Sequence, residues 1–273
     1  MNTATAISSG TGRRWSPPLL VRLSVVLHAA AAVTLAVHPE LWAWPVGAIA
    51  ANHLVIAGAT LWARGSWLGP NLVRLPDAAA RRGEICISFD DGPDPVLTPQ
   101  VLELLDRYQA KASFFCIGEK AAAAPELVKE ITRRGHSVEN HSYHHHNAFA
   151  LFGLSRLKRE VESAQAAVTA ITGRPPAFFR APAGFRSPLL DPVLVSIGLR
   201  YVSWTRRGFD VASGNPQRVL RRLTRGLAAG DLLLLHDSAK VVLAVLPALL
   251  EHVSARGLKS VSLATACEEE PRG

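Results

Sequence analysis

Two short stretches hold residues whose types and spacing suit hydrolytic chemistry. In CISFDDGPDP, Asp90 and Asp91 stand side by side, directly before a Gly-Pro turn. Neighbouring carboxylates repel each other, so either the pair is a solvated turn or a cation lies between them. In HSVENHSYHHHN, five of the ten histidines fall between His136 and His146.

The histidines His141 and His145 have a spacing that suits a shared metal ion. Residues four apart point to the same side of a helical turn, so both imidazoles could bind one ion. Two imidazoles and one carboxylate leave coordination positions open for water and substrate, which is typical of catalytic metal sites. An HxxxH pair alone indicates little, because most histidines are ordinary core or surface residues. Combined with the paired aspartates, it favours a divalent metal site.

Alternating strand-like and helix-like patterns follow Arg64 and would position these residues. Repeated β-α alternation predicts parallel strands with crossover helices, in an open doubly wound sheet or a closed barrel. Polar residues that follow predicted strands include Asp90-Asp91, His141, Arg180 and His236, at the edge where such folds build their sites. Strands are predicted at 85–89, 112–116, 136–139, 177–180, 201–204, 232–235 and 260–263. Helices are predicted at 99–108, 125–134, from a cap at Ser155 to Gly173, and at 188–199, 216–228 and 241–256.

The amino-terminal part of the chain has a different composition. Residues 1–16 are small and polar and are expected to be disordered, and 17–64 is predicted to form a hydrophobic membrane hairpin. Its two nearly uncharged stretches, 19–37 and 41–62, each approach the ~20 residues that span a bilayer as a helix. Two transmembrane helices are favoured over an interfacial or re-entrant hairpin and over a cleaved signal peptide. A linker at 65–82, a catalytic domain at 83–268 and a tail at 269–273 complete the predicted organisation.

Charge and cysteine content limit the classes of partner. The 273 residues carry a formal net charge of +8, which favours anionic surroundings such as lipid headgroups or phosphorylated substrates, although solubility alone also explains it. No nucleic-acid-binding motif accompanies the charge. Arg13 and Arg14 precede the hairpin and further arginines follow it, while its turn has none, so the domain is predicted to face the cytoplasm from the bacterial inner membrane. The three cysteines lack metal or disulfide spacing, and Cys86 and Cys116 are expected to be buried small apolar residues.

The motifs SFDDGP, HSYHH, RAPAG and LLLLHD occur in an order that resembles the polysaccharide deacetylases of the NodB-homology type, carbohydrate esterase family 4. The resemblance extends from about Glu84 to the C-terminus. It implies an α/β fold, a distorted (β/α) barrel holding one divalent metal ion, most often zinc. It also implies a hydrolase that removes acetyl groups from amino sugars.

The first motifs carry over to a base and a metal site. By this resemblance Asp90 is the general base, and Asp91, His141 and His145 are the metal ligands. Arg180 of the R-x-P motif would orient and tune Asp90. Metal chemistry agrees with this division, because water near the ion becomes acidic and the base need only remove its proton.

The later motifs carry over to the general acid and the substrate contacts. His236 would be the general acid, with Asp210 holding it, and Leu234 would shape the pocket for the acetyl methyl group. Pro182 and Ala183 follow Arg180, and Ala183 replaces the tyrosine whose backbone N–H commonly lines the oxyanion site. The backbone donor survives this change.

The family's D-x-x-D-W motif is altered in this chain. RRGFDV keeps only Asp210, with Arg207 in place of the first aspartate. Arg206 and Arg207 are either a solvated loop or a phosphate-binding pair, since arginine offers bidentate contacts to phosphate.

These observations predict a metal-dependent deacetylase acting on an N-acyl amino sugar in a membrane- or lipid-linked envelope glycan precursor. An outward-facing peptidoglycan or exopolysaccharide deacetylase and a non-catalytic glycan-binding member of the fold remain alternatives. A phosphohydrolase built on the paired aspartates fits the HxxxH pair less well.

Overall fold

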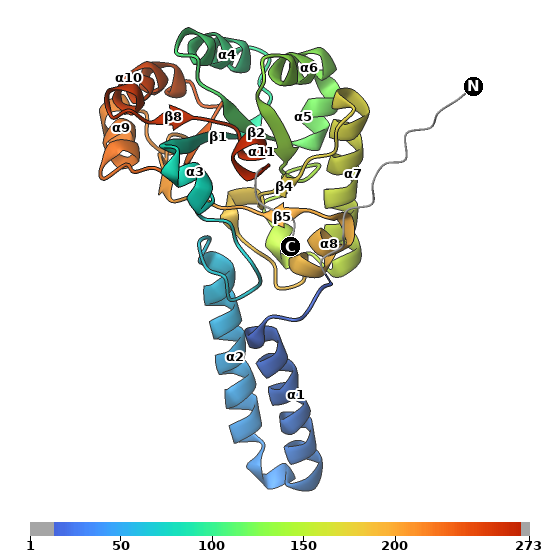
Figure 1. Cartoon of the computed structure of the whole chain (residues 1–273). Helices are drawn as coiled ribbons and strands as arrows, with labels where there is room; N and C mark the ends of the chain where they lie inside the picture. The colour runs from blue at the N-terminus through green and yellow to red at the C-terminus, as the bar shows by residue number, and fades with distance from the viewer. Residues whose placement is uncertain (1–13, 269–273) are drawn as a thin grey trace, which may run out of the picture.

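A computed structural model describes residues 14–268 as a helical hairpin followed by an α/β domain (Figure 1). The predicted tail at 269–273 and most of the predicted disordered segment at 1–16 lie outside the described residues. The strands are β1 (Glu84–Gly92), β2 (Ala112–Cys116), β3 (Ser137–Asn140), β4 (Phe178–Phe179), β5 (Arg200–Tyr201), β6 (Arg206–Arg207), β7 (Leu232–His236) and β8 (Lys259–Ser260). The α-helices are α1 (Leu19–Val37), α2 (Ala43–Leu61), α3 (Asp77–Arg81), α4 (Leu97–Arg107), α5 (Gly118–Ala123), α6 (Pro125–Arg133), α7 (Leu154–Thr172), α8 (Leu190–Ile197), α9 (Pro216–Thr224), α10 (Val242–Ala255) and α11 (Leu263–Cys267). Short 3₁₀ turns are η1 (Pro39–Leu41), η2 (Phe149–Leu151) and η3 (Pro182–Gly184).

The strands form one curved parallel sheet in the order β5-β4-β3-β2-β1-β7-β6, and β8 pairs with the start of β1. All strand pairs are parallel, so the carboxyl ends of the main strands meet at one edge. The sheet with its outer helices is the distorted (β/α) barrel that the sequence predicts.

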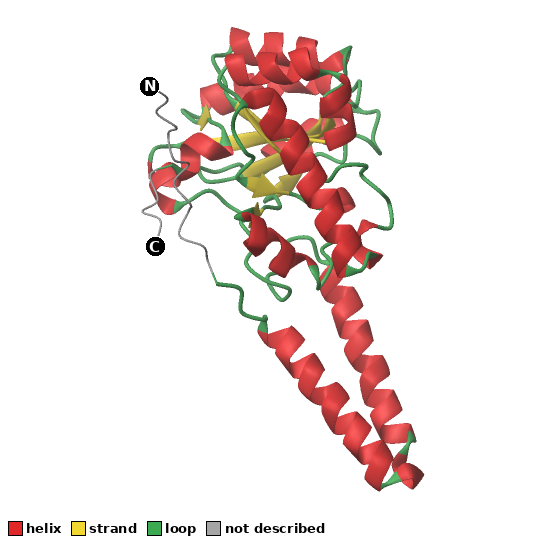
Figure 2. Cartoon of the chain, turned by 90° about the vertical axis from the view of Figure 1, so that its right-hand side faces the viewer, coloured by secondary structure: helices red, strands yellow, loops and turns green. Residues whose placement is uncertain are grey.

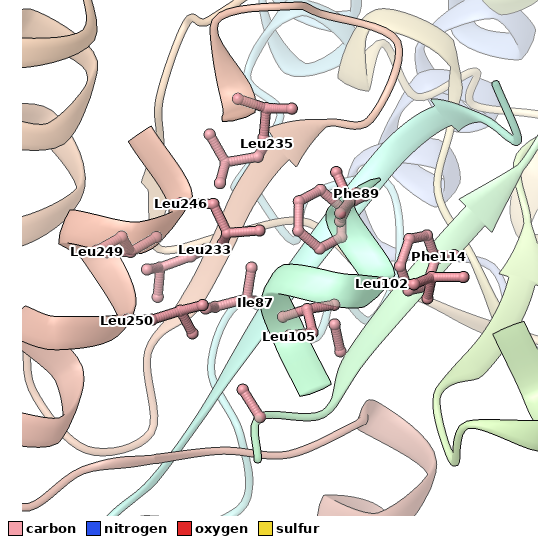
Figure 3. Packing of buried hydrophobic residues seen from close by; sticks show 14 of the residues in the cluster. Ile87, Phe89, Leu102, Leu105, Phe114, Leu233, Leu235, Leu246, Leu249 and Leu250 are labelled. Carbon is pink, nitrogen blue, oxygen red and sulfur yellow. The ribbon is translucent and has the colours of Figure 1, made fainter. Parts of the chain in front are cut away.

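The core lies between β1 and β7 and the helices outside them. Alternate residues of a strand point to opposite faces, and Ile87 and Phe89 of β1 and Leu233 of β7 point outward. Figure 3 shows them packed with side chains of α4 and α10, including Leu102 and Leu246. The opposite face of these strands is therefore turned toward the interior of the barrel, where polar residues gather.

The segment 65–82, expected as a linker, packs against the barrel. Leu72 forms a parallel bridge with Val202 and Arg74 an antiparallel bridge with Asp231. Leu68 and Leu75 are buried, and α3 follows them directly. This segment thus spans the part of the barrel between β5 and the start of β7.

Helices α1 and α2 pack side by side and project from the domain as a hairpin (Figure 2). Both are long and apolar enough to cross a membrane, with mean hydropathies of 2.0 and 1.3. Only 6% and 11% of their apolar windows is buried, so they are not core helices of the domain. Their polar residues pair with each other: Asn52 Nδ2 donates to Ser24 Oγ at 2.9 Å, and the rings of His28 and His53 are 5.3 Å apart. Such pairing satisfies polar groups that an apolar environment would leave exposed.

Several element boundaries differ from the sequence-based expectations. The last strand, β8, ends at Ser260 rather than at residue 263. Leu263 begins α11, whose first turn is capped by Ser262 Oγ accepting from Thr265 N. Helix α7 is preceded by Gly153 rather than capped by Ser155. Residues Arg206–Arg207, expected in a loop, form the edge strand β6.

Candidate functional site

Four strand ends bring the predicted site residues to one edge of the sheet. Asp90 lies in β1 directly opposite His236 of β7 in the parallel register. His141 follows β3, and Arg180 follows β4. Asp90 and His236 therefore project from neighbouring strands toward the same opening of the barrel.

Asp91, His141 and His145 converge on one point. His141 Nε2 is 3.3 Å and His145 Nε2 3.1 Å from Asp91 Oδ1, and the three ligand atoms all lie within 4.8 Å of one another. Asp91 Oδ1 is buried and has no hydrogen-bond partner of acceptable geometry among the described residues. A buried carboxylate oxygen left in this way is costly unless a cation satisfies it.

The two distances from Asp91 Oδ1 to the imidazole nitrogens fit a tetrahedral metal ion. Zinc bonds of about 2.0–2.1 Å in tetrahedral geometry hold ligand atoms about 3.3 Å apart. His141 Nδ1 faces the carbonyl oxygen of Arg180 at 2.8 Å, so that nitrogen must carry the proton. Nε2 of the neutral ring is then an acceptor, as a metal ligand has to be.

The loop that carries the two histidines is not the helical turn that their spacing suggests. Residues 141–146 are irregular, with left-handed backbone at Ser142 (φ 62°) and His145 (φ 51°). Ser142 Oγ accepts from His145 N at 3.1 Å and holds the turn closed. The i,i+4 spacing therefore brings the imidazoles together by a different route from the one predicted.

The charges gathered in this cluster shift the pKa values of Asp91 and His141. Burial alone would raise the pKa of the Asp91 carboxyl, but the close imidazoles of His141 and His145 outweigh burial and hold that pKa well below its usual range. Burial would lower the pKa of His141, but the carboxylates of Asp90 and Asp91 raise it. Each group stabilises the charged form of the other, so the centre of the cluster favours a cation.

Asp90 has a separate partner. Arg180 Nη1 lies 2.5 Å from Asp90 Oδ1 and 3.0 Å from Ser88 Oγ, and its Nη2 donates to the carbonyl of Ser203 at 3.0 Å. Arg180 is fully buried, and its guanidinium stacks 3.9 Å from the ring centroid of Phe115. The other carboxylate oxygen, Asp90 Oδ2, lies 3.8 Å from His141 Nε2 and faces the cluster of Asp91, His141 and His145.

His236 is held by Asp210, the remaining aspartate of the altered motif. Asp210 Oδ1 is 2.9 Å from His236 Nδ1, and Asp210 Oδ2 accepts from His236 N at 2.7 Å. Burial would lower the pKa of His236, but Asp210 and the charges of Asp90 and Asp91 raise it. Nε2 is 4.0 Å from Asp91 Oδ2, so the free nitrogen of the ring faces the cluster.

The turn after the aspartates is closely packed. A Cβ atom at Gly92 would overlap the buried carboxylate of Asp237, so only glycine fits there. Asp237 accepts from Thr98 Oγ1 at 2.5 Å, and burial raises its pKa to about 7. This contact fixes the turn that directs Asp91 away from Asp90.

The predicted substrate contacts occupy distinct positions. Leu234 is buried on the same inward face of β7 as His236. Pro182 and Ala183 lie in η3; Ala183 is exposed and adopts a left-handed conformation (φ 55°). Their roles in substrate binding stay predictions.

The predicted pair of Arg206 and Arg207 is not formed. Successive residues of β6 point to opposite faces of the sheet. Arg206 Nε lies 2.5 Å from Asp231 Oδ2, and its Nη atoms contact the carbonyls of Arg225 and Gly226. The guanidinium carbon of Arg207 instead lies 5.1 Å from the ring centroid of Trp204 and 4.9 Å from that of Phe209.

Sequence reasoning missed two residues beside the cluster. Glu160 of α7 binds the histidine loop: Oε2 accepts from Tyr143 N at 3.2 Å and His144 N at 3.0 Å, and Oε1 is 2.8 Å from His144 Nδ1. A signal was present, because Glu160 lies on the apolar face of its helix beside Leu157 and Val161. Lys240, the other residue, gave no such signal.

A cavity of about 360 Å³ opens above the cluster, lined by Asp91, Asp210, Val211, Ser238 and Lys240 among others. Lys240 is exposed, and its ammonium group has no hydrogen bond or ion pair within residues 14–268. The cavity therefore extends from the cluster of Asp91, His141 and His145, called the acidic cluster below, to the exposed side chain of Lys240.

The fold and motifs place the chain among known enzymes. A polysaccharide deacetylase family model matches residues 77–202. A peptidoglycan-N-acetylglucosamine deacetylase of Bacillus cereus is 30% identical over 66% of this chain and 85% of its own length. The chain belongs to the polysaccharide deacetylase family. It is a hydrolase that acts on N-acetylated sugars.

Further relatives have related activities in their names. A chitooligosaccharide deacetylase of Azorhizobium caulinodans is 34% identical over 57% of this chain and 74% of its own length. Among solved structures, a family 4 carbohydrate esterase from Streptomyces lividans, in complex with acetate, is 30% identical with a TM-score of 0.63, covering 67% of this chain and 95% of the esterase. The family resemblance read from the motifs is confirmed.

Proposed function

We propose that this deacetylase is metal-dependent and that Asp91, His141 and His145 hold one divalent ion, with zinc the best match to the donor set. The observation that carries the proposal is the buried Asp91 Oδ1, which lies 3.1 and 3.3 Å from two imidazole nitrogens and has no hydrogen bond of acceptable geometry among the described residues. The tautomer of His141, set by the carbonyl of Arg180, leaves its Nε2 free to bind the ion.

The ion would supply acidified water and polarise the acyl carbonyl group. Asp90 acts as the general base and removes the proton of the attacking water, and the contact from Arg180 Nη1 orients Asp90. His236, with its pKa raised by Asp210, donates a proton to the leaving amine. The backbone N–H of Ala183 serves the developing oxyanion, and Leu234 lines the space for the acetyl methyl group.

For the substrate, we propose an amino sugar joined through phosphate to a membrane lipid. Two observations support this choice: a hairpin of two apolar helices, and Lys240 lining the cavity beside the acidic cluster. In this proposal the phosphate would face Lys240 rather than the Arg206–Arg207 pair that the sequence suggested.

We also propose that α1 and α2 anchor the chain in the bacterial inner membrane with the domain on the cytoplasmic side. Arg14 precedes the hairpin and Arg64 follows it, whereas its turn at His38–Glu40 has no basic residue apart from the histidine. Reporter fusions placed after Arg64 test the side, and export of the domain would contradict it.

A second candidate is an outward-facing deacetylase of peptidoglycan, the glycan named for the Bacillus cereus relative. The non-catalytic alternative loses support because Asp90, Asp91, His141, His145, Arg180 and His236 are all present and converge.

Release of acetate or formate by the full-length protein in vesicles tests the proposal. The panel contains one N-acyl amino sugar in three forms: joined to a lipid phosphate, as a soluble oligosaccharide, and in peptidoglycan. We expect chelator-sensitive release that is fastest from the lipid-linked form. Fastest release from peptidoglycan would favour the second candidate, and release that a chelator leaves unchanged would contradict metal dependence.

A further inference from the structure

An apolar groove lies where the hairpin meets the domain, away from the acidic cluster. Its volume is about 750 Å³. One side is the start of α1 and the residues before it, and the other is the segment that follows α2. Its lining includes Leu19, Leu23, Trp67, Gly69 and Pro70.

The position of this groove is set by the hairpin. Leu19 begins α1, and Trp67 follows the end of α2, so both lie at the domain end, opposite the turn at η1 (Figures 1 and 2). Leu19, Leu23 and Trp67 are 70%, 57% and 52% exposed and continue the apolar surface of the helices. With the hairpin in a bilayer, the groove lies at the boundary between hydrocarbon and headgroups, where tryptophan is favoured.

One wall of the groove is bonded to the predicted substrate loop. The buried guanidinium of Arg186 donates from Nη1 to the carbonyls of Gly69 and Pro70, both at 2.9 Å. The backbone N–H of Arg186 donates to the carbonyl of Thr60 in α2 at 3.2 Å. Arg186 lies three residues after Ala183, so α2, the groove and the loop of the RAPAG motif form one connected unit.

We propose that the groove binds the hydrocarbon chain of the lipid-linked sugar, which rests on the proposed function above. Its apolar lining and its volume suit a flexible chain, since ligand cavities commonly measure about 300–1,000 Å³. The groove is continuous with the apolar hairpin, so a chain can enter from the bilayer without crossing water.

The chain's own first residues suit the groove poorly. Residues 1–13 read MNTATAISSGTGR, in which Ile7 and Met1 are the large apolar residues. Such a polar segment would bury few apolar groups in exchange for its ordering. Deletion of residues 2–13 distinguishes a lipid chain from these residues as the occupant of the groove. If the lipid is the occupant, the deletion leaves labelling of the groove by a lipid probe unchanged.

Photolabelling of the full-length protein in vesicles tests the site without relying on turnover. The probe is a long-chain isoprenyl phosphate with a diazirine near the phosphate. We expect labelled peptides to contain residues 19–23 and 66–70, and labelling to be displaced by unlabelled isoprenyl phosphate but not by a diacyl phospholipid. Uniform labelling along the hairpin, or equal displacement by the diacyl lipid, would overturn the proposal in favour of bulk lipid.

Matched substitutions connect the groove to substrate choice. Leu23→Trp fills the groove, whereas Leu35→Trp places the same bulk at an exposed position of α1 outside its lining. We expect Leu23→Trp to lower kcat/KM for the lipid-linked sugar relative to the soluble one on the order of tenfold, and Leu35→Trp to leave that ratio unchanged. An unchanged ratio in both variants contradicts the groove assignment, while absence of turnover in the wild type, with labelling intact, contradicts the proposed function alone.

Discussion

Asp90 and Asp91 are neighbours in the chain, but their carboxylates meet different partners. Asp90 Oδ1 lies 2.5 Å from the buried guanidinium of Arg180, whereas Asp91 Oδ1 faces the imidazoles of His141 and His145. The left-handed backbone of Asp91 (φ 69°) turns its side chain away from that of Asp90. Aspartate tolerates this conformation better than most residues, so the turn suits both the geometry and the chemistry.

The loop that carries the histidines depends on Glu160. We expect Glu160→Gln to weaken metal affinity by about 10–100-fold, the usual effect of removing a group that orients ligands. Metal titration of the purified variant measures this. Glu162→Gln is the matched control, since Glu162 lies on the same helix, half exposed, and pairs with Lys158 at 3.6 Å. Wild-type affinity in Glu160→Gln would show that the loop holds its shape without the carboxylate.

The pair of Arg180 and Asp90 should contribute to stability as well as to catalysis. Removing one partner of a buried ion pair leaves an uncompensated charge, so we expect Arg180→Met to lower the free energy of unfolding by about 3–5 kcal/mol. In the double variant Arg180→Met/Asp90→Asn the loss should be smaller, because no unpaired charge remains. Denaturant unfolding of the four proteins completes the cycle, and purely additive losses would argue against direct coupling.

The pH dependence of turnover should report His236. Its pKa is raised, so the protonated ring required of a general acid is present at low pH and lost as the pH rises through that pKa. Asp210→Asn removes a charge that raises this pKa, so the alkaline limb of the kcat/KM profile should move to lower pH. His236→Ala should cost on the order of 10²–10⁴ in kcat. An alkaline limb that stays in place in Asp210→Asn would remove His236 from the role of acid.

The site residues could be predicted because strand ends and motif order are local features of the sequence. Asp90 and His236 come at the ends of strands with clear apolar runs, His141 follows a short strand between helical patterns, and parallel strands bring those ends to one edge. The link between Asp210 and His236 was also predictable, because Asp210 is the one matching residue of its motif. Both distances in that contact bear it out.

Other features depend on contacts that no local pattern reveals. The segment 65–82 resembles a linker in composition, but its partners, Val202 and Asp231, are more than a hundred residues away. The sequence suggested that Arg206 could bind phosphate, but in the fold its guanidinium pairs with Asp231. The i,i+4 spacing of the histidines suggested a helical turn, which the left-handed backbone at Ser142 and His145 replaces.

Lys240 should discriminate between phosphorylated and neutral sugars. Its ammonium group lines the cavity beside Asp91, so we expect Lys240→Gln to raise KM several-fold for a sugar phosphate and to leave KM for the neutral sugar nearly unchanged. Lys259→Gln is the control, because Lys259 lies in β8, which pairs with the opposite end of β1. Equal effects on the two substrates would assign Lys240 no part in recognising phosphate.

The division of roles between the two aspartates is tested most directly by measuring bound metal and turnover together in Asp91→Ala and Asp90→Asn. Asp91→Ala removes a proposed metal ligand, whereas Asp90→Asn removes the proposed base and leaves all three ligands in place. We predict that Asp91→Ala loses both metal and activity, whereas Asp90→Asn keeps stoichiometric metal and loses turnover. Equal loss of metal in both variants, or turnover retained in Asp90→Asn, would contradict the account.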